Sequence, residues 1–581
     1  MPRTPPSLLP LVLLPFLVSP GAVAQEPPPP APETFYESID VEVVNLEVFV
    51  TDRQGNHVTG LTRDDFEILE NGKPVEITNF FAVAGEAAPA VIGPISPIGP
   101  IGPTQPPTAP PVDDEQRLHL AIVVDNLSLT APSRNRLLKS LREEVIPRLR
   151  PGDLALVGTY EGSNVELAQG LTGDRAALLT ALGEVAKGAP RGVERAMEKR
   201  RLLQDIETST GASAEIGNGA DASLKVTEGV YAGIRLYAQQ LYDETRGTLE
   251  SLTRFADALA GLPGRKALLY VGGGLSVRPG QAFFEAYQNR FPEISRDVGA
   301  SPLDSFQHDL TQFFDQMVEH ANGNRVTFYT LGATEELAGL SAEAGGFAAW
   351  SSDLERLETF DLTESLQRLA DATGGLSSIN GINPGPILAR MRDDFDSYYS
   401  LGYLSPGKKD GRNRRIEVRL RNPRDLVVRH RDGRRERTSH DRMTDRTLAA
   451  LLLDPGKNPL EVELEMGRET RNDKGQMQVE MLVKFPLAKL VLLPQGTFHE
   501  GRVSVFVSAR DTRGRSSPVQ EIAIPIRVPN DQLLTVLGQI AAYKMPLLLR
   551  PEEHRIAVAV RDELGNVDAA VTATYKPDQE R

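Results

Sequence analysis

The chain has 581 residues, of which 40% are hydrophobic and 25% are charged, a composition typical of globular proteins. A chain of this length exceeds what one hydrophobic core supports, so we expect several domains. The formal net charge of −15 opposes binding to nucleic acid, because that binding needs clustered positive charge against phosphate. The chain has no cysteine, which excludes disulfides, thiolate catalysis and cysteine–zinc sites.

The first residues have the features of a secretory signal peptide. The apolar stretch Leu8–Val18 precedes Ala22-x-Ala24, the small-x-small pattern at which such peptides are cleaved. The stretch is too short to cross a bilayer as a helix and contains two prolines. No later segment reaches about 18 consecutive apolar residues, so we expect no transmembrane segment in the mature chain. We expect residues 1–24 to be removed and the protein to be extracytoplasmic, either periplasmic or secreted.

The segments that follow differ sharply in composition. Residues 25–39 are rich in proline and should form an extended tether. Residues 40–83 contain alternating apolar positions and the hairpin signal Asn71-Gly72, which together predict a small β-module. Residues 84–115 are rich in proline and glycine and cannot form a core, so we expect a linker.

Strands and helices alternate over residues 116–435. This alternation predicts a doubly wound, mostly parallel α/β sheet with helices on both faces. Right-handed crossovers between the strands should place their carboxyl ends on one edge of the sheet. A polar segment near residues 187–235 is expected to be an insertion. The strands expected in this sheet end at Asp125, Tyr160, Val271 and Leu331.

Strand patterns return in the last third of the chain. The segment that begins at Tyr398 could be an edge hairpin of the parallel sheet or a link to the next module. Residues 436–458 are expected to be a linker, and residues 459–576 predict a β-sandwich-like module. An Asp-x-x-Gly pattern recurs after strands and predicts hairpin turns, because one carboxylate per turn cannot supply the six to eight oxygens that Ca²⁺ takes. The three instances begin at Asp52, Asp511 and Asp562.

Several segments resemble known sequences. The apolar strand that ends at Asp125, with its hydroxyl-rich turn, resembles the opening of a von Willebrand factor type A (VWA) domain. The resemblance covers roughly residues 40–435 and is to the VWFA-related domain family first described in acidobacterial secreted proteins. The other segments that carry it are VVNLEVFVTDRQGNHVTGLTRDDFEILENGKPVEITNF (43–80), LTGDRAALLTAL (171–182), LAGLPGRKALLYVGG (259–273), LADATGGLSSING (369–381) and YYSLGYLSPGKKDGRNRRIEVRL (398–420).

The resemblance implies a degenerate metal site. VWA domains with an intact metal-ion-dependent adhesion site carry Asp-x-Ser-x-Ser and hold Mg²⁺ for contact with a partner's carboxylate. Asp125 matches the first ligand, but Leu127 and Leu129 occupy the two serine positions. Ser128 and Thr130 lie one residue away and could become ligands only after a shift in the turn. We expect no bound metal or other cofactor, with Mg²⁺ as the one cation left open.

The function implied by the resemblance is non-catalytic, metal-independent binding of another protein or a cell-surface component. No catalytic motif such as Gly-x-Ser-x-Gly or His-Glu-x-x-His is present. The alternatives are a secreted hydrolase or other enzyme with an unrecognised site, and a structural component of envelope assembly. Glycines let a ligand approach the backbone at the carboxyl edge of an open sheet. The expected partner-binding edge comprises Asp125, Asn126, Ser128, Thr130, Gly272, Gly273 and Gly274.

The signal peptide gives the first testable prediction. The native protein should begin at Gln25 and should be found outside the cytoplasm, because Ala24 completes the cleavage signal. N-terminal sequencing of protein recovered from fractionated cells measures this directly. A chain that retains Met1 and stays in the cytoplasmic fraction would contradict the prediction.

Overall fold

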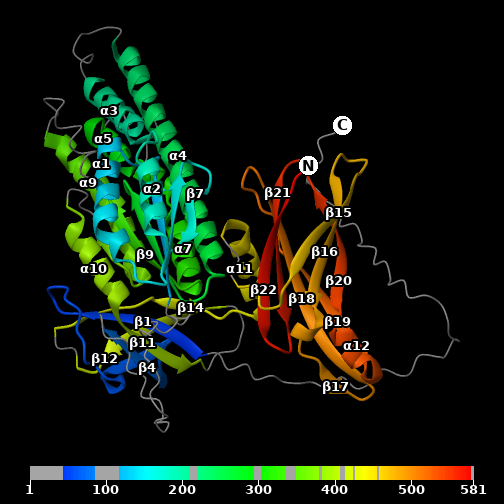
Figure 1. Cartoon of the computed structure of the whole chain (residues 1–581). Coiled ribbons are helices and arrows are strands. Elements are labelled where there is room, and N and C mark those ends of the chain that lie inside the picture. The colour runs from blue at the N-terminus through cyan, green and yellow to red at the C-terminus, as the bar shows by residue number, and fades with distance from the viewer. Residues whose placement is uncertain are drawn as a thin grey trace. The chain divides into compact units, whose positions relative to one another are not determined.

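The computed structural model describes residues 43–84, 117–209, 219–292, 302–333, 349–378, 383–405, 412–422, 425–453 and 457–577 (Figure 1). The fold is mixed α/β, with one mainly parallel sheet and several antiparallel sheets. The expected signal peptide (1–24), the expected tether (25–39) and nearly all of the expected linker (84–115) lie outside the described residues.

Six strands form the parallel sheet in the order β10-β9-β8-β5-β6-β7. Neighbouring strands from β10 to β6 run parallel, whereas β7 is antiparallel to β6. The four strands expected from the sequence therefore share one sheet with their carboxyl ends on one edge, as predicted. The strand bounds are β5 (Leu118–Asp125), β6 (Leu154–Tyr160), β7 (Val165–Thr172), β8 (Arg265–Gly272), β9 (Val326–Gly332) and β10 (Ser377–Ser378).

Helices cover both faces of this sheet (Figure 1). Every residue of β5 is buried, because Leu120 and Ile122 pack against α1, α2 and α10 while Ala121 and Val123 pack on the other face against α4, α7 and α9. A strand buried on both faces reads as a continuous apolar run. The helices are α1 (Ala131–Ser140), α2 (Arg175–Val185), α4 (Gly219–Leu259), α7 (Thr311–Gly323), α9 (Ala349–Ala372) and α10 (Gly385–Asp396).

Most of the described residues in the segment expected to be an insertion are helical. It contains α3 (Gly192–Thr208) and the first half of α4, a helix of 41 residues. Apolar residues of α3, including Ile206, pack with Tyr237 of α4 and with Phe283 of α5 (Gln281–Arg290) in a separate core. These helices therefore form a layer with its own apolar packing.

The N-terminal β-module is built from two distant parts of the chain. Its two sheets have the strand orders β13-β1-β11-β4 and β14-β12-β2-β3. Leu46 of β1 pairs with Leu401 of β11, and the two sheets share one core. The strands after Tyr398 therefore pair with the β-module and not with the parallel sheet. The bounds are β1 (Val43–Thr51), β2 (Phe66–Glu70), β3 (Lys73–Val75), β4 (Ile77–Ala84), β11 (Ser397–Leu404), β12 (Asn413–Leu420), β13 (Val427–Arg429) and β14 (Gly433–Arg435).

The C-terminal strands form two antiparallel sheets around a shared core. One sheet has the order β15-β16-β20, and the other has the path β17-β18-β21-β22 with β19 paired to β18. The expected linker at 436–458 contains α11 (Ser439–Leu452). The remaining bounds are β15 (Glu463–Arg471), β16 (Met477–Pro486), β17 (Leu493–Gln495), β18 (Phe498–Asp511), β19 (Gln520–Pro529), α12 (Leu533–Leu537), β20 (Ile540–Leu549), β21 (His554–Asp562) and β22 (Val567–Tyr575).

The Asp-x-x-Gly segments form turns, as expected. Gly55 has φ 87° and Gly514 has φ 77°, and in both turns the glycine N–H donates to the aspartate carbonyl at 3.0 Å. In the third turn the positive φ falls instead on Asn566, at 54°. Among the described helices, none has the length and apolarity needed to cross a membrane.

A buried carboxylate, Asp394 at the end of α10, joins the β-module to the parallel sheet. It is 0% exposed and accepts two hydrogen bonds from Arg429 of β13, at 2.5 and 3.0 Å. His57 of the β-module lies 2.9 Å from the same carboxylate, and Tyr329 of β9 donates to it at 3.1 Å. Arg265 of β8 donates to the backbone carbonyl of Asp394 at 3.2 Å.

Replacing Asp394 with alanine should destabilise the protein strongly, because Arg429 would stay buried without its carboxylate. Removing one partner of a buried ion pair costs about 3–5 kcal/mol, which urea denaturation can measure as a loss in the free energy of unfolding. Asp393→Ala is a matched control, since this neighbouring carboxylate is 45% exposed and pairs with Arg392. It should cost about 0.5 kcal/mol or less. Equal losses in the two variants would contradict this role for Asp394.

Candidate functional site

The expected partner-binding residues lie on two loops that follow neighbouring parallel strands, β5 and β8. Their backbones approach closely, because the Gly273 N–H donates to the Ser128 hydroxyl at 2.8 Å. A Cβ on Gly273 would lie 2.4 Å from the Ser128 carbonyl oxygen, so this approach requires glycine. Gly274 adopts φ 110°, and a Cβ there would meet Leu362 of α9 at 2.7 Å.

Asp125 receives three hydrogen bonds from within the protein. The Leu127 N–H donates to Oδ1 at 2.9 Å, and the Ser128 hydroxyl donates to Oδ2 at 2.7 Å. The Tyr270 hydroxyl of β8 donates to the same Oδ2 at 2.6 Å. Asp125 is 2% exposed, so its carboxylate is an acceptor inside the fold. Within the described ranges, no three His, Cys, Asp or Glu side chains gather closely enough to hold a metal ion.

Tyr270 was not among the residues expected from the sequence. Burial, and then the charge of Asp125, raise the pKa of Tyr270 well above its ordinary value, so the phenol stays protonated and donates. A Cβ on Gly272 would lie 2.6 Å from the Tyr270 ring, so Gly272 leaves room for that ring. The sequence signal was weak, because a tyrosine within an apolar strand also suits a plain core position.

The two leucines at the serine positions pack inward. Leu127 is 5% exposed, and Leu129 is 1% exposed within the core beneath α1 and α2. Thr130 caps α1: its hydroxyl oxygen accepts from the Ser133 N–H at 3.4 Å and lies 2.5 Å from the Ser133 hydroxyl. Asn126 donates through its side-chain amide to Glu161 at 3.2 Å.

The segment leading into α3 covers this edge. The Arg191 N–H donates to the Asn126 carbonyl at 2.7 Å, and the Gly192 N–H donates to the Leu129 carbonyl at 2.9 Å. A Cβ on Gly192 would lie 2.4 Å from that carbonyl oxygen. The four expected polar residues are therefore at most 6% exposed and lie beneath the surface of this edge. They are Asp125, Asn126, Ser128 and Thr130.

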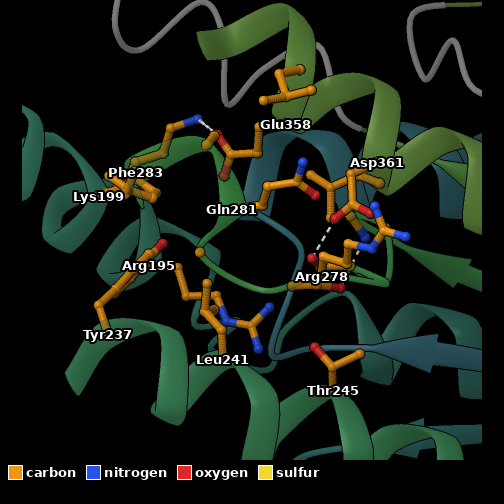
Figure 2. A pocket seen from close by; sticks show the side chains of 18 of the residues that line it. Arg195, Lys199, Tyr237, Leu241, Thr245, Arg278, Gln281, Phe283, Glu358 and Asp361 are labelled. Carbon is orange, nitrogen blue, oxygen red and sulfur yellow. Dashed lines mark hydrogen bonds and ion pairs between the residues drawn. The ribbon is translucent and has the colours of Figure 1, made fainter. Parts of the chain in front are cut away.

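A pocket opens above the same two loops (Figure 2). Its empty volume is about 800 Å³ including its open mouth, and Ser128, Gly273 and Gly274 line it. Helices α3, α4, α5 and α9 supply the other walls. Sequence reasoning located this edge but none of the side chains that the helices contribute.

Charged side chains in the pocket are paired with one another or with near neighbours. Arg195 of α3 forms an ion pair with Glu244 of α4. Lys199 of α3 forms one with Glu358 of α9 (Figure 2). Burial lowers the pKa of Arg195, but the charges of Glu244 and Asp125 raise it more, and the net pKa is above its ordinary value. The guanidinium is therefore a permanent cation near the edge.

A half-buried carboxyl, Asp361 of α9, lies on another wall of the pocket. It accepts from the Ser276 hydroxyl and from the Val277 N–H, the latter at 3.1 Å. Burial raises the pKa of Asp361 above its ordinary value, although both of these hydrogen bonds act to lower it.

Two hydroxyl-bearing side chains contribute to the helical wall of the pocket. Tyr237 and Thr245 of α4 both line the pocket, and each is 6% exposed. The Tyr237 ring meets the Phe283 ring edge-on, with 5.1 Å between centroids. Burial raises the pKa of Tyr237 above its ordinary value, so its hydroxyl stays protonated.

Comparison with known proteins gives no family: no family model and no curated protein matches the chain. Among solved structures, one similar chain is described as the X-ray structure of Northeast Structural Genomics Consortium target SoR45. It is 12% identical, and the match covers 21% of this chain and 89% of that one with a TM-score of 0.16. A similarity at that score supports no conclusion about fold or function.

Replacing Asp125 with asparagine tests whether the carboxylate serves the fold. An amide nitrogen cannot accept from the Ser128 and Tyr270 hydroxyls, so we expect a loss of about 1–3 kcal/mol in the free energy of unfolding. Millimolar Mg²⁺ should not shift the melting midpoint of the unaltered protein relative to EDTA. If Mg²⁺ bound, a free concentration of a hundred times its Kd would add about 2.7 kcal/mol to the free energy of unfolding. A gain in stability for Asp125→Asn would contradict the structural role of the carboxylate. A Mg²⁺ shift that this variant abolishes would establish a metal site instead.

Proposed function

We propose that this chain is an exported binding protein with a VWA-like α/β domain. Its domain recognises another protein or a cell-surface component, without catalysis and without bound metal. The pocket at the carboxyl edge of the parallel sheet carries this proposal. Ligands of open α/β sheets bind at that edge, where loops from neighbouring strands meet.

The arrangement of the sheet supports a VWA-like, Rossmann-like, doubly wound domain. A buried parallel strand ends at Asp125, and the turn after it contacts the loop that follows β8. Helices cover both faces of the sheet. These features agree with the sequence resemblance over residues 40–435.

The environment of Asp125 supports recognition without a metal. Its carboxylate is engaged by Leu127, Ser128 and Tyr270, and ligating a cation would require breaking at least part of this network. Nearly octahedral coordination of Mg²⁺ needs several oxygen ligands, whereas Leu127 and Leu129 turn apolar side chains into the core.

The polar groups of the pocket also favour binding over catalysis. Catalysis by a serine needs a base that takes its proton and a third group that orients the base. Ser276 donates to Asp361, but among the described residues that line the pocket there is no histidine to complete such an arrangement.

The test is capture of a partner from envelope extracts of the source cells, in EDTA and in Mg²⁺. We expect the unaltered mature protein to retain the same partner in both buffers. Ala196→Tyr on α3 should abolish capture, because Ala196 lines the pocket and a tyrosine there fills it. Met197→Tyr is the matched control, since Met197 lies next to it on the same helix and is 68% exposed.

Two outcomes would contradict the proposal. Capture that requires Mg²⁺ and disappears in EDTA would show a metal-dependent site. Capture that survives Ala196→Tyr as well as Met197→Tyr would show that the partner binds elsewhere. Circular dichroism of both variants checks that α3 still folds, so that a loss of capture reports on the pocket.

A further inference from the structure

A second cavity is separate from the pocket described above, because the two share no lining residue. Its empty volume is about 660 Å³ including its open mouth. Its walls come from α4, from α11, from the segment that leads into β7, and from the end of β18 with the turn that follows it. Apolar side chains, among them Phe255 of α4 and Leu448 of α11, form part of the lining.

Arg510 of β18 lines this cavity without a partner of opposite charge. Its guanidinium makes no hydrogen bond or ion pair within the described part of the chain. The carboxylate of the next residue, Asp511, is already engaged, since it accepts from Arg515 at 2.7 Å and from Arg550 at 3.0 Å. Burial, and then the charge of Arg555, lower the pKa of Arg510 below its ordinary value. Arg510 is therefore a half-buried cation whose N–H donors are unused.

A second arginine approaches the same place. Arg254 of α4 also lines the cavity and donates to the side-chain oxygen of Asn164 at 3.2 Å. A Cβ on Gly514 would lie 3.0 Å from the amide nitrogen of Asn164 and 3.1 Å from Nη2 of Arg510. The Asn164 side chain thus contacts Arg254 through its oxygen and approaches Arg510 with its nitrogen. Both guanidinium groups therefore lie close to one amide that lines the cavity.

Donors prevail over acceptors among the other polar groups of the lining. The Ser251 hydroxyl oxygen accepts from the Val165 N–H at 3.1 Å, which leaves its O–H free to donate. The one carboxylate among the described lining residues, Asp257, accepts from the Asn324 amide at 2.6 Å and lies 2.9 Å from His320. The unused donors and the excess of positive charge both favour an anionic ligand with several acceptor oxygens.

We propose that this cavity binds a phosphate or sulfate group, held by the guanidinium groups of Arg254 and Arg510 and by the amide nitrogen of Asn164. Arginine pairs bidentately with oxyanions of this kind. A phosphate monoester offers three terminal oxygens to such donors, one more than a carboxylate. A sulfate ester has the same arrangement of oxygens. The inference goes beyond the proposed function, because it assigns a second site with a ligand of its own.

The test measures binding of inorganic phosphate, inorganic sulfate and acetate to the full mature chain by isothermal titration calorimetry at constant ionic strength. We expect phosphate and sulfate to bind at least tenfold more tightly than acetate, because each can accept at least one more charge-assisted hydrogen bond. Ala196→Tyr should leave this binding unchanged, since it fills the other pocket.

Arg510→Gln removes the unpartnered cation and should weaken binding of phosphate and sulfate about tenfold or more. Arg502→Gln is the matched control: Arg502 lies on the same strand, is exposed and does not line the cavity. It removes the same charge, so a general effect of net charge would appear in both variants. We expect Arg502→Gln to leave binding unchanged.

Asn164→Asp tests the same site from the opposite direction and keeps the inference testable if Arg510→Gln fails to fold. It keeps the size of the side chain but places a carboxylate beside Arg254 and Arg510. Binding of phosphate should be lost, and the melting midpoint without ligand should rise, because the new charge pairs with the two arginines. Phosphate should raise the melting midpoint of the unaltered protein and not that of this variant.

The relative affinities identify the ligand more closely. Tighter binding of phosphate indicates a phosphate ester, and tighter binding of sulfate indicates a sulfate ester; both support the inference. Failure of both anions to bind, binding of acetate as tight as theirs, equal weakening by Arg502→Gln, or loss of binding in Ala196→Tyr overturns it. The last result would place the anion in the first pocket.

Discussion

The buried carboxylate of Asp394 is the constraint on which the arrangement of the N-terminal part depends. It stands at the end of α10, where the chain leaves the helical layer and enters β11, and it is held by Arg429 and Tyr329. Such a charge is tolerated in an interior only when it is paired and hydrogen-bonded. The β-module is therefore anchored near the amino ends of the parallel strands, where Arg265 begins β8 and bonds to Glu47 of β1 at 3.0 Å. This position leaves the carboxyl edge to the loops and helices that form the pocket.

Local pattern was enough to predict the parallel sheet, because its strands are short apolar runs followed by helical periodicity. The composition of the β-module could not be predicted in the same way. Its core needs Leu46 beside Leu401, residues separated by most of the α/β domain. The sequence after Tyr398 fitted both an edge hairpin of the parallel sheet and a link to the next module. Alternating apolar residues show that a strand has an apolar face, but they do not show with which strand it pairs. Helix α3 and the first part of α4 were not predicted for a related reason. They bury apolar residues mainly against each other and α5, so their pattern carries no sign of the sheet.

In the candidate site, too, some residues could be predicted from local sequence pattern and others could not. Asp125 and the glycines at 272–274 were predicted because strand ends and glycine runs are visible in the sequence. Tyr270 was not, since only the pairing of β8 with β5 brings its hydroxyl to Asp125. The expectation that the polar residues of this edge face a partner does not match their burial. The segment before α3 bonds to the backbone of Asn126 and Leu129 and closes the edge from above. A sequence pattern can place a carboxylate at a sheet edge, but the solvent accessibility of that carboxylate depends on which other segments of the chain pack against the edge.

The polar groups at this edge fall into two classes: those that are hydrogen-bonded beneath the edge and those on the helical wall of the pocket. Asp125 and Ser128 are saturated by donors and acceptors of the protein itself, so a ligand that approached them would have to displace existing hydrogen bonds. Tyr237 and Thr245 lie on the α4 wall of the pocket, and each is 6% exposed. The low dielectric of the interior strengthens the hydrogen bonds that Asp125 makes, which raises the cost of displacing them. Under the proposed function, a partner would therefore contact the helical walls of the pocket before it reached the carboxylate beneath them.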